Sequence, residues 1–152
     1  MDNYTRESLA IEVGQSLKGE DVVRVLDAVA AERGTPQTIK VDNGREFISK
    51  TMDRWAYEHG VELDFSRPGT PTDNAKVDSF NGRFRQECLN EHWFLSLADA
   101  RSKIVDWRRY YNENRPHSAL RWATPAEFTR QARKNASTDD STKPEISTSG
   151  RY

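Results

Sequence analysis

Two aspartates, Asp42 and Asp78, stand at positions from which a carboxylate can reach a reacting group or a metal ion. Asp42 ends a short stretch predicted as a strand, and Asn43-Gly44 turns the chain immediately after it. Side chains at such strand ends project into the crevice where α/β sheets place their sites. Asp78 lies on a predicted helix, with thirty-five residues between it and Asp42. By position alone, a turn residue and a solvated helix residue remain the commoner interpretations of these two acids.

Basic residues form a second candidate feature, because the charge is unevenly distributed along the chain. Residues 1–64 carry 8 Lys/Arg against 13 Asp/Glu, whereas residues 65–134 carry 13 against 8. The stretch 101–134 holds nine of these cations against three acids. A basic stretch is typical of a surface that binds nucleic-acid phosphates, and a solvated helical face is the alternative.

The elements that must position these residues are predicted from periodicity and from capping and turn residues. Alternating apolar residues predict strands over 4–16, 37–41 and 61–65. Apolar residues at helical spacing predict helices over 20–33, 47–59, 74–90 and 97–114, and Thr124-Pro125-Ala126-Glu127 predicts the start of another. A Pro-Gly loop at 68–71 precedes the helix that carries Asp78. Strands that alternate with helices indicate an α/β fold.

Composition narrows the class of protein. The chain has 152 residues, enough for about one domain. It has no apolar run of the ~18 residues that a membrane span needs and no signal-peptide pattern at its start, so we expect no membrane association. Cys88 is the single cysteine, which excludes an internal disulfide and, with three scattered histidines, a zinc cluster. These features favour a cytoplasmic location.

Six linked motifs carry a resemblance to a known family. Their order and number make the match far more specific than two acids alone. They are VDNGREFIS (41–49), RPGTPTDNA (67–75), DSFNGRFRQECL (78–89), WRRYYN (107–112), RPHSAL (115–120) and TPAEF (124–128). Residues 1 to about 130 therefore resemble the catalytic core of insertion-sequence transposases, a core of the retroviral integrase type.

This resemblance implies an RNase H-like fold, a mixed sheet flanked by helices, with an Asp, Asp, Glu triad. The triad would bind two divalent metal ions, Mg²⁺ or Mn²⁺, for DNA cleavage and strand transfer. Asp42 matches the second acid and Asp78 the third, as catalytic residues and metal ligands. The resemblance also implies partners: transposon-end and target DNA, and further copies of the chain. The candidate DNA-binding residues are Asn43, Lys76, Arg83, Arg85, Arg108, Arg109 and Arg115.

Two departures from the family pattern qualify the expected activity. Asp78 stands where the family has Glu and is one methylene shorter. The family's first acid belongs to a strand before Tyr4, and the sequence shows no such acid, because Asp2 aligns with the following strand. The first strand is therefore expected to be missing or separately encoded. We expect a core domain over 1–130 and a disordered polar tail over 131–152. A non-catalytic DNA-binding or assembly module, or an inactive remnant, is the alternative to a transposase; an unrelated RNase H-like nuclease fits the motifs poorly.

Overall fold

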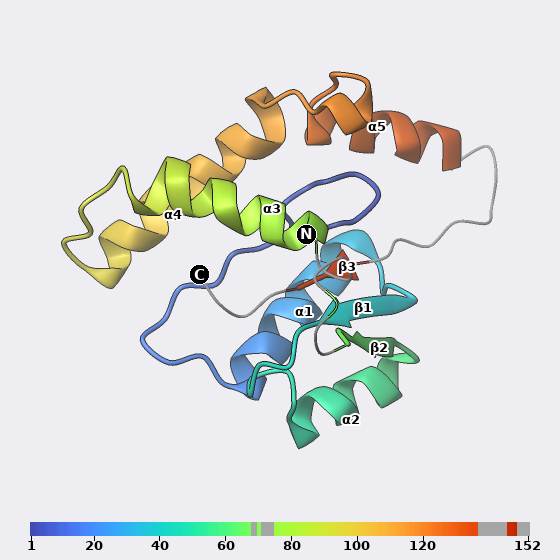
Figure 1. Ribbon diagram of the computed structural model, residues 1–152. Helices are drawn as coiled ribbons and strands as arrows, with labels where there is room; N and C mark the ends of the chain where they lie inside the picture. Colours follow the sequence, from blue (N-terminus) through green and yellow to red (C-terminus); the bar gives the residue numbers. More distant parts are fainter. Residues whose placement is uncertain (68–69, 71–74, 137–145, 149–152) are drawn as a thin grey trace.

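The computed structural model describes residues 1–67, 70, 75–136 and 146–148 (Figure 1). The elements alternate between helix and strand in the first half and are mostly helical in the second. In chain order they are α1 (Gly19–Arg33), β1 (Thr38–Val41), α2 (Lys50–His59), β2 (Glu62–Phe65), α3 (Ala75–Phe84), η2 (Arg85–Leu89), α4 (Leu97–Asn114), η3 (Ser118–Leu120), α5 (Pro125–Ala136) and β3 (Ile146–Ser147). This order confirms the predicted α/β class and all five predicted helical stretches.

Strand β1 is the centre of a three-stranded sheet with the order β2-β1-β3. Both pairings are parallel, with Ile39 opposite Leu63 in β2 and opposite Ile146 in β3. The resemblance predicted a mixed sheet; in the described part of the chain, the antiparallel contribution is the isolated bridge between Asp2 and Ile146. Ile39 and Val41 are completely buried and, being two positions apart, face the same side of the sheet, whereas Thr38 and Lys40 on the other side are partly buried.

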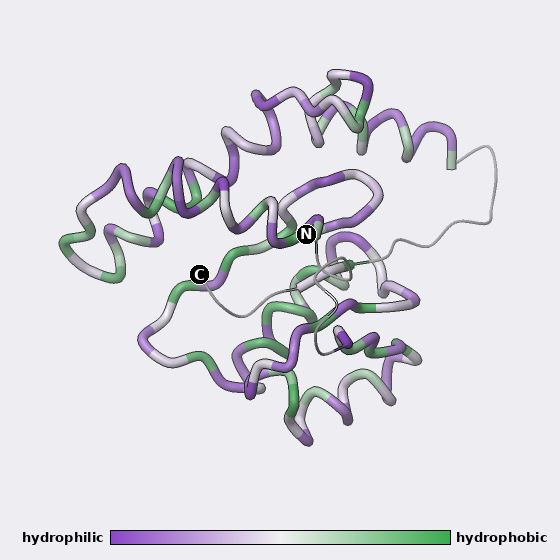
Figure 2. The backbone as a smooth tube through the Cα atoms, viewed as in Figure 1, coloured by the Kyte–Doolittle hydropathy of each residue, from purple (hydrophilic) through white to green (hydrophobic). Residues whose placement is uncertain are grey.

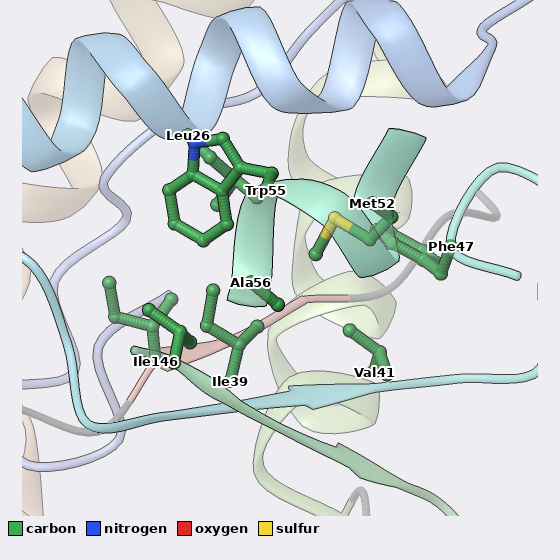
Figure 3. Close-up of a cluster of buried hydrophobic side chains, with 9 residues drawn as sticks. Leu26, Ile39, Val41, Phe47, Met52, Trp55, Ala56 and Ile146 are labelled. Atoms are coloured by element: carbon green, nitrogen blue, oxygen red, sulfur yellow. The ribbon is translucent and has the colours of Figure 1, made fainter. Parts of the chain in front are cut away.

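A first hydrophobic core lies between the sheet and the pair α1 and α2 (Figure 3). Met52 and Trp55 of α2 point toward Ile39 and Val41 of β1, and Leu26 of α1 closes the cluster (Figure 3). Ser49 caps α2, because its hydroxyl accepts a hydrogen bond from the backbone N–H of Met52 at 3.2 Å. The helix therefore begins at Lys50, three residues later than its apolar pattern indicated.

A second core joins α3 and α4 and is mainly aromatic. Phe80 of α3 meets Tyr111 of α4 edge-on at 5.1 Å between ring centroids, and Phe84 lies 5.0 Å from Trp107. Beyond Phe84, the predicted helix over 74–90 continues as the π-helical turn η2 and ends at Asn90. In Figure 1, α3, α4 and α5 lie on the opposite side of the sheet from α2.

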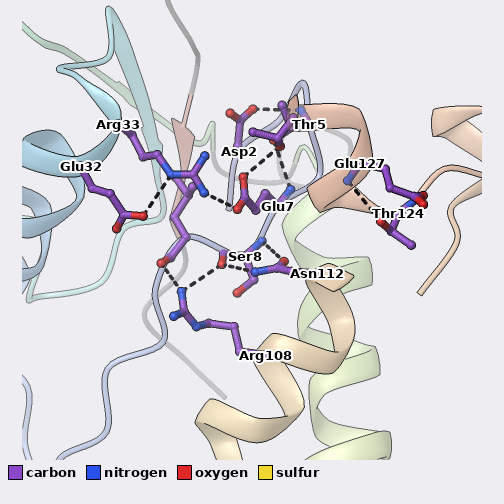
Figure 4. Close-up of polar contacts among 12 residues, drawn as sticks. Asp2, Thr5, Glu7, Ser8, Glu32, Arg33, Arg108, Asn112, Thr124 and Glu127 are labelled. Atoms are coloured by element: carbon purple, nitrogen blue, oxygen red, sulfur yellow. Dashed lines mark hydrogen bonds and ion pairs between the residues drawn. The ribbon is translucent and has the colours of Figure 1, made fainter. Parts of the chain in front are cut away.

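The strand predicted over residues 4–16 is absent, which corrects that prediction. Residues 7–14 contain no helix or strand and are tied to α4 instead (Figure 4). The side-chain amide of Asn112 donates to the Ser8 carbonyl at 3.0 Å, and its oxygen accepts from the Ser8 N–H at 2.8 Å. Among the described residues no strand pairs with this segment, so α4 side chains satisfy backbone groups that a sheet would otherwise satisfy.

The C-terminal region differs in part from the expected disordered tail. Helix α5 continues through Ala136, and Ile146–Ser147 pairs with β1 as the third strand. The start of α5 is as predicted: Thr124 and Glu127 form a reciprocal capping box at 2.9 and 3.2 Å. Helix α5 carries largely hydrophilic residues (Figure 2), so the composition of this region indicated disorder. Residues 137–145 and 149–152 of the expected tail lie outside the described residues.

Of the predicted Pro-Gly loop at 68–71, the structure describes residue 70; the rest of the loop and residues 72–74 lie outside the described residues. Within the described part of the chain, none of the helices combines the length and apolar character that crossing a bilayer requires.

Candidate active site and nucleic-acid surface

Asp42 follows the last residue of β1 and is partly buried. Its Oδ1 accepts a hydrogen bond from the backbone N–H of Gly44 at 2.9 Å, which closes the turn. Asn43 is exposed and donates from its side-chain amide to the Ser66 carbonyl at 3.2 Å, just after β2. The turn that carries Asp42 thus follows β1 directly and is bonded to the chain just after β2.

Glu46 is a second carboxylate at this turn, and the sequence interpretation did not single it out. A Cβ added at Gly44 would lie 2.8 Å from Asp42 Oδ1 and 2.8 Å from Glu46 Oε1. Both oxygens therefore face the same point, and no residue larger than glycine fits there without moving them. The spacing Asp42, Gly44, Glu46 in the sequence was the available signal.

Asp78 lies in the first turn of α3 and is exposed, whereas its neighbour Val77 is buried. A cavity of about 120 Å³ has Glu46, Phe47, Val77 and Phe80 in its lining, whereas Asp42 and Asp78 themselves do not line it. The turn after β1 and the start of α3, which carry the two predicted catalytic acids, therefore border one cavity.

The carboxylates of the described residues do not complete a metal site. No group of three or more His, Cys, Asp or Glu side chains in the described ranges converges closely enough to hold an ion. Asp42 and Asp78 supply hard oxygen donors of the kind that Mg²⁺ prefers. A site for two ions needs a further carboxylate that bridges them.

The predicted DNA-binding residues fall into two groups, and the first is exposed. Lys76 and Arg85 lie on the outer faces of α3 and η2. Arg83 is exposed and lies one helical turn before Glu87, with its guanidinium 4.0 Å from the carboxylate, a weak i,i+4 pair. Arg109 is exposed and pairs with Asp106 at 2.6 Å. These cations are accessible to a phosphate backbone.

Arg108 and Arg115 form the second group, because their guanidinium groups already make internal contacts. Arg108 donates to the carbonyls of Ser8 and Leu9 and so holds the N-terminal segment on α4 (Figure 4). Arg115 donates to both carboxylate oxygens of Glu87, at 2.6 Å to Oε2. Both arginines contribute to folding, and their role in DNA binding stays a prediction.

Aromatic residues near the end of α4 are mostly structural. Trp107 and Tyr111 are buried, and burial raises the pKa of Tyr111 to about 12. Tyr110, between them in the sequence, is 55% exposed. His117 packs edge-on against Tyr111 at 5.1 Å, in agreement with a structural role. Burial, with smaller contributions from Arg115, Arg83 and Arg6, lowers the pKa of His117.

Cys88 is completely buried, which raises the pKa of its thiol.

Comparison with known families decides how this arrangement is interpreted. Two sequence profiles, both described as integrase core domain, match residues 1–71 and 59–125. The chain belongs to the integrase core family. Within it, Asp42 lies inside the first matched segment and Asp78 inside the second.

Two insertion-element proteins are similar to this integrase core. A 39.2 kDa protein of Xanthomonas euvesicatoria is 52% identical over 84% of the chain, and a 31.7 kDa protein of Burkholderia multivorans is 48% identical over 90% of it. Both are described as uncharacterised insertion-element proteins. The chain spans 37% and 49% of their lengths, so it corresponds to less than half of each relative.

A solved structure supports the fold. The catalytic core domain of BIV integrase superposes with a TM-score of 0.61, over 83% of this chain and 80% of that domain. The two sequences are 13% identical, so the similarity concerns the architecture. The RNase H-like fold that the motifs implied is therefore confirmed.

Proposed function

We propose that this integrase core acts in DNA transposition and DNA integration, as the part of a transposase that binds DNA and supplies two of its metal-ligating carboxylates. The observation that carries the proposal is the placement of Asp42 and Asp78 on two elements that border one cavity. Mg²⁺ or Mn²⁺ would supply the chemistry at such a site, by activating an attacking hydroxyl and stabilising the departing oxygen. Cleavage and strand transfer then require a further carboxylate.

DNA is the proposed partner because the second half of the chain is basic and helical. Lys76, Arg83 and Arg85 follow one another along α3 and η2, close in sequence to Asp78. Cations beside a phosphoryl-transfer site hold the backbone on either side of the reacting phosphate. Asn43, Arg108, Arg109 and Arg115 are proposed to contribute at the edges of this surface.

Further copies of the chain, or a separately encoded segment, would complete the assembly on transposon-end and target DNA, in the cytoplasm. Residues 1–130 are proposed as the core domain, to whose sheet the strand Ile146–Ser147 is added. A domain that binds DNA without cutting it is the second candidate function, since the described carboxylates do not complete a metal site.

The test measures the affinity of the chain for duplex DNA by fluorescence anisotropy at increasing salt concentrations. Replacing Lys76 and Arg85 by Glu should weaken binding and lower the slope of log K against log salt by about 0.9 for each phosphate that is no longer neutralised. Arg24→Glu is the matched control, because Arg24 is an exposed arginine of α1 outside the basic region. Equal effects of all three substitutions, or binding that is independent of salt, would contradict the proposed surface.

A further inference from the structure

The turn between α4 and α5 presents Trp122 to solvent in an unusual backbone conformation. Trp122 is 73% exposed, and both it and Arg121 have positive φ values, of 66° and 55°. Residues other than glycine rarely adopt such values, and when they do, the surrounding structure must enforce them. An indole held outward in this way contributes nothing to the hydrophobic core.

Backbone hydrogen bonds make this turn rigid. The His117 carbonyl accepts from the N–H groups of Leu120 and Trp122, both at 2.9 Å, and the His117 N–H donates to the Ala123 carbonyl at 3.1 Å. Leu120, 3% exposed, anchors the turn from below. The backbone that carries Trp122 is therefore fixed before any ligand arrives, which reduces the entropic cost of binding.

Three arginines lie near His117, at the base of the turn. Arg115 lies 6.0 Å from the Tyr111 ring, which in turn contacts His117. Arg83 and Arg115 converge on Glu87 from two different helices, at 4.0 and 2.6 Å. The charges of Arg115, Arg83 and Arg6 all help to lower the pKa of His117, so all three lie near it. Glu87 neutralises one of these three charges, so the neighbourhood stays positive.

We propose that this turn is a binding site for unpaired DNA, in which Trp122 stacks on an exposed base while the exposed Arg121 beside it and the arginines near His117 hold the adjoining phosphates. An exposed aromatic ring bordered by arginines is the combination that binds single strands without sequence preference. The inference rests on the proposed function, since it assigns a place for a single-stranded end on the same DNA-binding protein.

The experiment measures anisotropy of a labelled oligothymidylate of about ten nucleotides with the full chain. Trp122→Leu should weaken binding roughly five-fold or more, whereas Trp122→Phe should keep most of it, because an aromatic face remains. Leu and Phe both carry a Cβ, as Trp does, so neither substitution changes the cost of the positive φ at position 122. Thermal unfolding of each variant checks that the fold is retained.

Two controls separate stacking from other effects. Trp93→Leu removes an even more exposed tryptophan, 91% exposed, before the other end of α4, and should leave the affinity unchanged. An abasic oligonucleotide of the same length offers phosphates without bases, so the wild type and Trp122→Leu should bind it equally. If Trp122→Leu binds oligothymidylate as the wild type does, the stacking site is wrong while the proposed function stands. If the chain binds neither duplex nor single-stranded DNA at low salt, both are wrong.

Discussion

Arg115 Nη1 donates to both carboxylate oxygens of Glu87, and this ion pair joins the C-terminal end of α4 to η2 across 28 positions of sequence. Arg115 is 21% exposed and Glu87 34% exposed, so water screens the pair only in part. The indole N–H of Trp107 also donates to Glu87, at 3.4 Å. One carboxylate thus holds together two elements that the sequence alone shows only as separate helices.

Removing this pair should destabilise the fold. Arg115→Ala and Glu87→Ala are each expected to lower the free energy of unfolding by about 1–2 kcal/mol, because each leaves a partly buried charge without its partner. Urea unfolding measures the change. Arg109→Ala is the control, since its pair with Asp106 is 63% exposed on both sides and should be worth less than about 0.5 kcal/mol. Equal destabilisation by the two kinds of substitution would show that burial does not strengthen the Arg115–Glu87 contact.

The stability of the fold should fall at mildly acidic pH because of His117. Burial lowers the pKa of His117 in the folded state below its ordinary value of 6.5. As the pH falls through about 6.5, the unfolded chain takes up a proton that the folded chain does not, so stability decreases until the lower folded pKa is passed. The free energy of unfolding, measured with urea between about pH 7.5 and 5.5, should depend less steeply on pH in His117→Gln than in the wild type. The exposed His92→Gln is the control, and a wild-type slope in His117→Gln would contradict the prediction.

The thiol of Cys88 should be unreactive in the folded protein. It is completely buried in the α3–α4 core, and burial raises its pKa, so both access and the thiolate fraction are low. A chromogenic disulfide reagent should label it only at the rate of unfolding, and at full speed in denaturant. Rapid labelling under native conditions would show that the α3–α4 core opens locally.

Strand transfer should be absent for the chain alone with Mg²⁺. Asp42 and Asp78 provide two carboxylates, and two-metal chemistry needs one that bridges both ions. Asp78→Glu adds reach but no third ligand, so it should not restore activity. A processing assay on labelled end-like DNA, with Mg²⁺ and then Mn²⁺, measures this.

The informative comparison adds an upstream strand that carries an Asp, with and without Asp78→Glu. We expect the added strand to matter more than the added methylene, and both together to matter most. Robust joining by the unmodified chain that Asp42→Ala abolishes would show that the chain already holds its full set of ligands.

The sequence by itself determined the elements whose signals are local. Apolar spacing predicted α1 and α4, the Thr124 and Glu127 pattern predicted the cap of α5, and the linked motifs predicted the family and its fold. Caps and helical faces are decided by residues three or four positions apart, so the chain sequence contains them directly. Asp42 was identified in the same way, from a strand followed by a tight turn.

The tertiary structure alone decided what depends on partners distant in sequence. Alternating apolar residues at Leu9 and Ile11 indicated a strand, yet a strand exists only where another pairs with it, and Asn112 and Arg108 take that place. Ile146 joins β1 although its surroundings are polar, because the edge of β1 offers hydrogen-bond partners and a covered apolar face. Hydrogen bonds and ion pairs form wherever folding brings groups together, and sequence spacing does not record those meetings.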